Sequence, residues 1–213
     1  MNRPPKVLDP QATYTFSRYC ELAFDIEDIL ADLDCQFDRD LLHFEPFQGT
    51  FDRIPLLQEQ ISDGIRYITL NSEQARREFL IAPLIREICR TTQQRVRVEY
   101  PVVVSNWLRG TLDYYFQAQN LVVIEAKRDN LSQGFTQLAI ELLALDQWTD
   151  RDTPHLYGAV TTGENWRFGI LYREQRRIVE DLKLYRVPEE LERLMSILLG
   201  LLTPVEPTPL NTP

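Results

Sequence analysis

The stretch Leu121-Val-Val-Ile-Glu-Ala-Lys127 follows Leu108-Arg-Gly-Thr-Leu-Asp-Tyr-Tyr-Phe116 after a short polar segment, and these two runs decide the fold. Both are rich in branched and aromatic residues, and the polar segment between them is typical of a chain reversal. The sequence therefore predicts a β-hairpin. Side chains alternate along a strand, so Glu125 and Lys127 project from one face while Ala126 points to the other. A carboxylate and an ammonium group thus share one face of the predicted hairpin.

Asp113 lies in the first strand of this hairpin, and two registers are open to it. If Phe116 faces Leu121 across a four-residue loop, Asp113 faces Ile124. A loop that is one residue longer places Asp113 directly opposite Glu125. Either register brings the two carboxylates close together.

The chemistry of this trio follows from its charges. Two carboxylates at one place repel each other unless a positive charge lies between them, and a hard divalent cation such as Mg²⁺ takes oxygen ligands of this kind. Lys127 would then lie beside the ion, where it could orient the attacking water and stabilise charge on a phosphate. The alternative is that Asp113, Glu125 and Lys127 are surface residues, with Glu125 and Lys127 a solvated ion pair of little energy.

Three segments together resemble the PD-(D/E)XK, or restriction-endonuclease-like, nuclease superfamily. They are Gly110-Thr-Leu-Asp113, Val122-Val-Ile-Glu125-Ala-Lys127 and Gln133-Gly-Phe-Thr-Gln137. In that family an Asp and the Glu of an E-x-K triplet bind the metal, the Lys assists the water, and the following helix often carries a Gln. Leu112 stands where the family name has Pro, a departure that is frequent in this divergent family.

The resemblance implies a fold, a cofactor and a set of site residues. The fold is a mixed central β-sheet flanked by helices, and the cofactor is Mg²⁺ or Mn²⁺. The implied metal ligands are Asp113, Glu125 and the carbonyl of Ala126; the implied catalytic side chains are Asp113, Glu125, Lys127, Gln133 and Gln137. As ordinary surface glutamines, the last two would need no functional explanation.

A helix that begins after Ser72 is similar to the opening helix of the nuclease domain in type I restriction subunits, which supplies another Glu. Ser72 is a suitable N-cap, and an apolar stripe at helical spacing follows it: Leu80, Ile81, Leu84, Ile85 and Ile88. Glu73 lies on the edge of that stripe, whereas Glu78 lies well around the helix, so we expect Glu73 to be the additional metal ligand. The alternative is that Glu73 is a favourable acid in a first helical turn. Pro83 predicts a bend.

The remaining elements are predicted from periodicity and turn residues. We expect a helix over 131–148, a hairpin of strands 156–162 and 166–172, a strand within 178–187, and a helix from Pro188 whose leucine stripe is core or subunit interface. In the N-terminal third, an amphipathic helix spans Tyr19 to Leu33 with an acidic outer face. The predicted division is an N-terminal acidic extension at 1–71, a nuclease-like core at 72–175, a completing strand and helix at 176–202, and a proline-rich tail at 203–213.

Composition indicates a protein of the cytoplasm. The chain has 213 residues, of which 44% are hydrophobic, enough for a substantial core. Its three cysteines, Cys20, Cys35 and Cys89, are widely spaced and suggest neither a disulfide framework nor a zinc cluster. The start of the chain lacks a signal-peptide pattern, and the apolar tract Met195 to Leu202 is too short to span a bilayer, so we expect no membrane partner.

The net charge of -9 opposes binding to nucleic acid, but its distribution is uneven. Residues 1–63 carry 5 basic and 13 acidic side chains, whereas residues 76–128 carry 9 basic and 5 acidic ones. Eight arginines in this basic region could line a groove: Arg76, Arg77, Arg86, Arg90, Arg95, Arg97, Arg109 and Arg128. Arg109 and Arg128 flank the predicted hairpin and are the best candidates for phosphate contacts.

The sequence thus predicts a metal-dependent nuclease of α/β fold, acting on nucleic acid with DNA favoured, in restriction, defence or repair. It could act as a homodimer or with further subunits. Two alternatives belong to other classes. One is a catalytically silent module of the same fold that binds nucleic acid or a protein, with the acidic N-terminal region regulating its groove. The other is a dimerisation domain built on the C-terminal leucine stripe.

Overall fold

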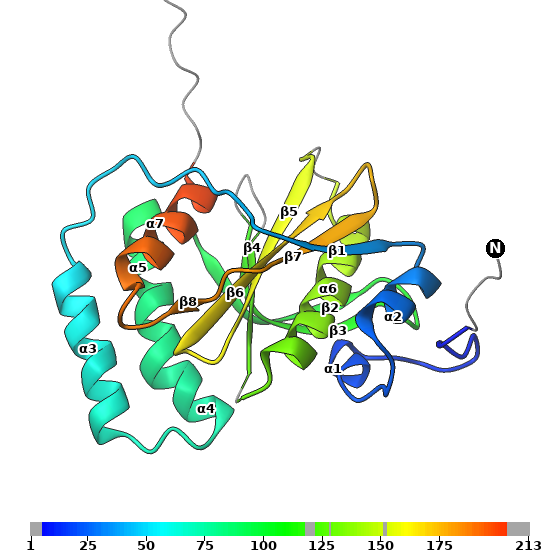
Figure 1. The fold of residues 1–213 in the computed structure, drawn as a ribbon, viewed down its shortest axis with the longest axis horizontal. Helices are drawn as coiled ribbons and strands as arrows, with labels where there is room; N and C mark the ends of the chain where they lie inside the picture. The colour runs from blue at the N-terminus through cyan, green and yellow to red at the C-terminus, as the bar shows by residue number, and fades with distance from the viewer. Residues whose placement is uncertain (1–5, 118–121, 128, 151–152, 204–213) are drawn as a thin grey trace, which may run out of the picture.

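The computed structural model describes residues 6–117, 122–127, 129–150 and 153–203, and these form a mixed α/β fold. The described residues build an open sheet of eight strands in the order β1-β7-β6-β5-β4-β3-β2, with β8 paired to β6 (Figure 1). The strands are β1 (Gln36–Asp40), β2 (Val96–Val103), β3 (Arg109–Phe116), β4 (Val122–Ala126), β5 (His155–Thr161), β6 (Asn165–Tyr172), β7 (Arg177–Asp181) and β8 (Tyr185–Arg186). The β4–β5 and β1–β7 pairs are parallel, and the others are antiparallel.

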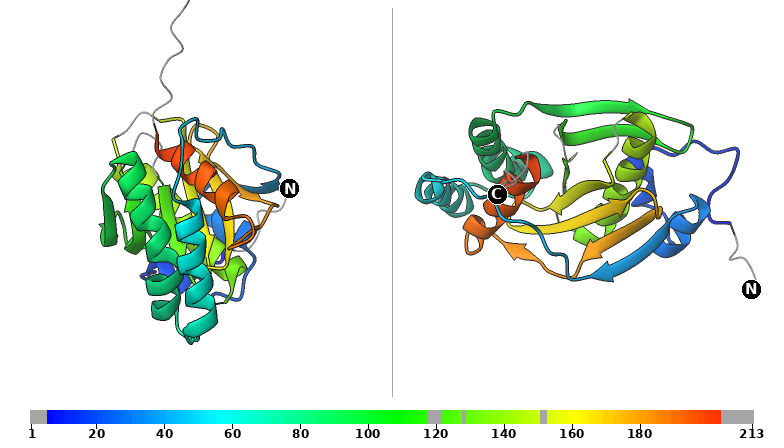
Figure 2. Two further views of the ribbon diagram at one scale, coloured as in Figure 1. Left: turned by 90° about the vertical axis from the view of Figure 1, so that its left-hand side faces the viewer. Right: turned by 90° about the horizontal axis from the view of Figure 1, so that it is seen from above.

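Helices flank the sheet and pack in two separate hydrophobic clusters. One cluster contains side chains of α3 (Ile54–Tyr67), α5 (Ala82–Thr92) and α7 (Leu191–Leu202), and the other contains those of α1 (Phe16–Tyr19), α2 (Ile26–Asp32) and α6 (Leu131–Trp148). Seen from above, the two ends of the sheet curve around α6 (Figure 2). Phe37 of β1 contacts Phe135 of α6, with ring centroids 6.2 Å apart, and β2 also contacts this helix.

The predicted hairpin is present as β3 and β4, and its register is the one with the longer loop. Phe116 pairs with Val122, and Tyr114 pairs with Ile124. Continued by one residue, this register places Asp113 opposite Glu125. The shorter register, in which Asp113 faces Ile124, is therefore wrong. The loop residues themselves lie outside the described part of the chain.

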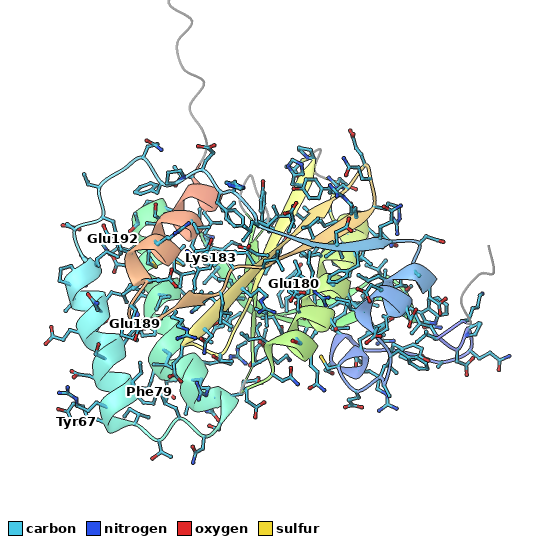
Figure 3. The ribbon with its side chains drawn as sticks, viewed as in Figure 1. Tyr67, Phe79, Glu180, Lys183, Glu189 and Glu192 are labelled. Atoms are coloured by element: carbon cyan, nitrogen blue, oxygen red, sulfur yellow. The ribbon has the colours of Figure 1, made fainter. Side chains whose placement is uncertain are left out.

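The helix expected after Ser72 is continuous but changes its winding. It runs through α4 (Glu73–Arg76), a π-helical turn over Arg77–Ile81, and α5. Pro83 has no N–H to donate to the carbonyl four residues earlier, and a wider π turn accommodates that loss. The predicted apolar stripe is buried. Phe79 of the π turn remains 37% exposed, at the same end of the helical layer as Tyr67 (Figure 3).

Several predicted elements agree with the structure. Helix α6 has the expected bounds, and the hairpin of β5 and β6 matches the expected pair of strands within a residue. The predicted C-terminal leucine stripe lies in α7, and its side chains are buried within the chain. That stripe is core, so it offers no surface for a dimerisation domain.

Three predictions were wrong in detail. The helix expected over Tyr19 to Leu33 is two short helices, α1 and α2, because Tyr19 is held by a hydrogen bond from its hydroxyl to the Trp107 carbonyl, 2.8 Å away, and Cys20 contacts α6. The strand expected within 178–187 is divided into β7 and β8, because the Asp181 carboxylate accepts from Lys183 N at 2.9 Å and turns the chain. Helix α7 begins at Leu191 instead of Pro188.

The structure also contains elements that the sequence patterns did not indicate, namely β1, β2 and α3. Strand β1 adds to the edge of the sheet beside β7, with Gln36 paired to Arg177 and Asp40 to Asp181. Residues of the acidic N-terminal region therefore belong to the central sheet. Within the described residues, no helix combines the length and the apolar character needed to cross a membrane.

Candidate active site

Glu125 lies near the C-terminal end of β4 and is only 2% exposed. Its Oε1 is 2.7 Å from the Lys127 ammonium nitrogen, so alternation along the strand does place both groups on one face. Its Oε2 is buried and accepts no hydrogen bond from any donor in the described residues. A buried carboxylate oxygen without a hydrogen-bond donor costs free energy. Binding of a proton or a cation to that oxygen would remove the cost.

Helix α6 places two more polar side chains against Lys127 and Glu125. Gln137 is 5% exposed and accepts a hydrogen bond from Lys127 Nζ at 2.8 Å through its Oε1. Its Nε2 donates to Glu141 Oε1, also at 2.8 Å. Because one amide end faces an ammonium and the other a carboxylate, the orientation of Gln137 is fixed. The result is a continuous polar chain from Glu125 through Lys127 and Gln137 to Glu141.

The carboxyl groups of Glu125 and Glu141 form a buried pair. Burial, followed by the nearby Asp113, raises the pKa of Glu125 to about 8. Burial and the charge of Glu125 raise the pKa of Glu141 well above its ordinary value. Glu141 Oε2, like Glu125 Oε2, finds no donor among the described residues. Two carboxyl groups in such a place share at least one proton, because two buried like charges cannot both be ionised cheaply.

Asp113 faces this pair from β3 with a side chain that is 15% exposed. Its Oδ2 accepts a hydrogen bond from Ala126 N at 2.9 Å, which ties the two strands together where the ladder of β3 and β4 ends. Its Oδ1 lies 3.4 Å from Nη1 of Arg77. The structure therefore brings Asp113, Glu125 and Lys127 together, with Ala126 at the same end of the sheet.

Glu73 approaches the trio from the start of α4. Ser72 is the N-cap of that helix, since its Oγ accepts from Ala75 N at 3.1 Å. Burial raises the pKa of Glu73, and the charges that act on its carboxyl group include Lys127 and Asp113. Glu78, in contrast, is exposed. Of the two helix-borne acids, Glu73 is the one near the candidate site.

A glycine allows α6 to approach Lys127 this closely. A Cβ on Gly134 would lie 2.7 Å from Lys127 Cγ and 2.6 Å from Val160 Cγ2. Glycine within a helix costs about 1 kcal/mol relative to alanine. Asn130 supports this first turn as the N-cap, because its Oδ1 accepts from Gln133 N at 3.1 Å. Gly134 therefore lowers the helix propensity of this turn but allows α6 to pack closely against Lys127.

The site opens to solvent through a depression of about 560 Å³. Glu73, Lys127 and Gln137 line it together with Cys20 and Gln133. Gln133 is exposed at the rim, and its backbone carbonyl is 3.1 Å from Cys20 Sγ. A pocket of about 690 Å³ lies elsewhere, between residues 42–46 and α7, and contains none of these side chains. The smaller depression is the one at the site, because Lys127, Gln137 and Glu73 line it.

The predicted groove of arginines is only partly assembled. Arg76 binds the Thr162 carbonyl and Glu164, and Arg90 binds Glu87, so both are engaged in contacts outside the site. Arg77 is the arginine that contacts Asp113. Arg109 lies at the start of β3, and Arg128 lies outside the described residues.

The donor set fits a hard divalent cation in its chemistry. The ligands available are carboxylate oxygens, and Glu125 Oε2 is a buried acceptor in need of a partner. In the described residues, however, no three or more His, Cys, Asp or Glu side chains converge in a ready-made metal cluster. Lys127 contacts Glu125 and Arg77 contacts Asp113. A cation would need to take the place of one of these contacts.

Comparisons of this chain with protein family models, curated proteins and solved structures each found no match. The resemblance to the PD-(D/E)XK superfamily therefore remains a prediction that rests on the residues themselves. What the structure gives is a mixed α/β fold with an open, helix-flanked sheet, in which Glu125 and Lys127 meet at the end of β4.

Sequence reasoning missed two members of this cluster, Glu141 and Arg77. Glu141 follows Gln137 by four residues and Gln133 by eight, so these three polar side chains share one face of a helix that is otherwise almost wholly apolar. An acid in such a buried helix was the available signal. Arg77 was named only among eight basic residues, and its position depends on the π turn, which no local pattern specified.

Proposed function

We propose that this protein is a metal-dependent nuclease that hydrolyses phosphodiester bonds, with DNA the favoured substrate. The observation that carries the proposal is the meeting of Asp113, Glu125 and Lys127 where β3 and β4 end. A fold alone would not require these residue types at one place, and function is argued from the site. Asp113, Glu125 and Lys127 at the end of two neighbouring strands, beside a depression lined by Lys127 and Glu73, match what phosphodiester hydrolysis needs.

Each side chain has a role in this proposal. Asp113 and Glu125 hold Mg²⁺ or Mn²⁺, joined by Glu73 and the Ala126 carbonyl. When bound, the cation supplies an activated water and neutralises charge on the phosphate. Lys127 orients the water and stabilises the developing negative charge. Its ammonium stays protonated there, because the Glu125 carboxylate raises its pKa despite the opposing effect of burial.

The helix side chains position the lysine. Gln137 holds Lys127 through the 2.8 Å hydrogen bond from Nζ, and Glu141 fixes the orientation of Gln137. Gln133, at the rim, is the side chain better placed to meet substrate. A nuclease of this kind suits restriction, defence or repair, and its place in any of these remains a proposal.

The test is cleavage of plasmid DNA, single-stranded DNA and RNA with Mg²⁺ or Mn²⁺. We expect Glu125→Gln and Lys127→Met each to lower the cleavage rate by about 100-fold or more, the usual loss for a catalytic group of this type. Glu73→Gln should lower it as well, whereas Glu78→Gln, an equal change on the exposed side of the same helix, should leave it unchanged. Circular dichroism would show that all four variants fold.

A second candidate is a binding module of the same fold without catalysis. The observation that favours it is the ion pair between Arg77 and Asp113, which fills a ligand position. If the wild type cleaves none of these substrates and its melting temperature is the same with and without Mg²⁺ or Mn²⁺, the binding module replaces the nuclease. Binding of the same nucleic acids by fluorescence anisotropy would then be the next measurement.

A further inference from the structure

Arg77 reaches the candidate site from the π turn between α4 and α5. Its Nη1 lies 3.4 Å from Asp113 Oδ1 and 3.3 Å from Glu99 Oε1, and its Cζ lies 5.3 Å from the centroid of the Tyr114 ring. The arginine side chain is 18% exposed. It is therefore a mostly buried cation with two carboxylate partners and an aromatic one.

This contact decides what can bind Asp113. One oxygen of that carboxylate is occupied by the Ala126 amide, and the other faces Arg77. A divalent cation that binds Asp113 through Oδ1 competes with the positively charged guanidinium beside that oxygen. The separation of 3.4 Å exceeds that of a short charge-assisted hydrogen bond, about 2.8 Å, so the pair is loose and open to exchange.

Glu99 is a second ion-pair partner for Arg77. The pairing of Val98 with Tyr114 and of Tyr100 with Leu112 sets Glu99 opposite Asp113 across β2 and β3. Glu99 is 66% exposed and has a left-handed backbone with φ of 50°, which is uncommon for a residue other than glycine. The strained backbone holds its carboxylate beside Arg77. An arginine released by Asp113 would thus remain at the site with free donors.

Resting on the proposed nuclease function, we propose that Arg77 is an exchangeable counter-ion. It holds Asp113 in the cation-free protein and passes to a phosphodiester oxygen of the substrate when a divalent cation takes Asp113. Guanidinium donors suit phosphate oxygens as well as they suit carboxylates. Cation and nucleic acid therefore bind cooperatively, because each removes the competitor of the other, and this coupling must be reciprocal.

The coupling can be measured without catalysis. Ca²⁺ is the probe, since it takes the same hard oxygen ligands. Isothermal titration calorimetry gives its affinity for the free protein, and fluorescence anisotropy of a labelled DNA duplex, with and without Ca²⁺ at constant ionic strength, gives its effect on DNA binding. Four variants are compared with the wild type: Arg77→Gln, Glu99→Gln, Glu125→Gln and Arg97→Gln. The last is an equal loss of charge on β2, at an arginine that contacts Gln117 and Tyr100.

We expect Arg77→Gln to bind Ca²⁺ about fivefold more tightly than the wild type without DNA, the factor for an ion pair worth about 1 kcal/mol. The same variant should lose most of the increase in DNA affinity that Ca²⁺ gives the wild type. Glu99→Gln should bind Ca²⁺ more weakly, because Arg77 then has only Asp113. Arg97→Gln should match the wild type in Ca²⁺ affinity.

The outcomes distinguish a failure of the Arg77 exchange from a failure of the proposed nuclease function. If the wild type binds Ca²⁺ through Glu125 but Arg77→Gln binds it equally or less well, the exchange is wrong and the metal site stands. If the wild type, Arg77→Gln and Glu125→Gln all fail to bind Ca²⁺, the proposed metal-dependent nuclease is refuted, and the exchange is refuted with it. Should Arg77→Gln fail to fold, the exposed Glu99→Gln variant decides alone, and an unchanged Ca²⁺ affinity there would refute the exchange.

Discussion

Replacing Glu125 with glutamine should make the metal-free protein more stable at pH 8 and reduce the pH dependence of its stability between pH 5 and 8, the remainder coming from Glu141, whose pKa burial also raises. In the folded chain, Glu125 is buried against Glu141, with Asp113 nearby, and its pKa rises from 4.5 to about 8. Lys127 acts in the opposite direction but does not cancel the rise. Glutamine has nearly the same shape and no proton to lose.

The sign follows from proton binding. Between pH 4.5 and about 8 the folded chain keeps a proton that the unfolded chain has lost. Stability then falls as pH rises, because deprotonation favours the state that binds fewer protons. The stabilisation is fully present below pH 4.5 and is lost by about pH 8. Glu73, whose pKa is also raised by burial, acts in the same direction.

The full rise corresponds to about 5 kcal/mol in a rigid site, at about 1.4 kcal/mol for each tenfold change. Water penetration and relaxation of the site reduce this, so we expect the wild type to lose about 2 to 3 kcal/mol between pH 5 and 8. Glu125→Gln should lose less than the wild type over the same range, and Glu141 and Glu73 account for what remains.

Urea unfolding in the presence of EDTA, at four pH values from 5 to 8, gives these free energies directly. The control is Glu78→Gln, an equal change at an exposed position. Parallel pH curves for the wild type and Glu125→Gln would show that Glu125 is already ionised in the folded chain and would refute the shared proton. A curve for Glu78→Gln as flat as that for Glu125→Gln would do the same.

Three further results are expected. Gly134→Ala should destabilise the protein by about 1 to 3 kcal/mol in thermal or urea unfolding, although alanine normally favours a helix, because its Cβ would meet Lys127 Cγ at 2.7 Å; a gain in stability would show that the lysine moves aside freely. Glu141→Leu should lower the cleavage rate while Glu141→Gln retains more of it, since only the polar variant can still bind Gln137, and equal rates would refute this positioning. Asn130→Ala should lower the free energy of unfolding by about 1 kcal/mol through the lost N-cap, measured by urea titration.

Local periodicity accounts for the parts of the fold that were predicted. Helix α6 has its predicted bounds because apolar residues recur at helical spacing between Asn130, a capping residue, and Thr149. The hairpin of β3 and β4 follows from two apolar runs around a polar reversal. In each case the signal lies within a short stretch of chain, where sequence patterns are informative.

Long-range pairing accounts for the parts that were missed. Strand β1 reads Gln-Phe-Asp-Arg-Asp and has no alternating apolar face, because at the edge of the sheet most of its side chains meet solvent. It is a strand because β7 offers it a ladder of backbone partners more than a hundred residues away. No pattern within the segment specifies that ladder.

In the candidate site too, local patterns predicted some residues, whereas others depend on tertiary packing. The strand alternation placed Glu125 and Lys127 together, and helical phase correctly preferred Glu73 to Glu78 as the acid nearer the site. The choice between Gln133 and Gln137 needed the depth of α6 against the sheet, since only Gln137 reaches Lys127. Glu141 was not predicted as a site residue for the same reason. The apolar face of a helix does not show that its polar face is buried as well.

The parallel pairing of β1 with β7 has a consequence for synthesis and for dissection of the gene product. Residues 36–40 can pair with β7 only after residues 177–181 have been synthesised. The amino-terminal strand therefore lacks its backbone partner while most of the chain emerges from the ribosome. A fragment cut at 72–175 would lack both strands and α7. It would leave one edge of β6 unpaired and the apolar side of α5 uncovered, and such open edges promote aggregation. Expression of this protein should therefore be attempted with both flanking regions in place.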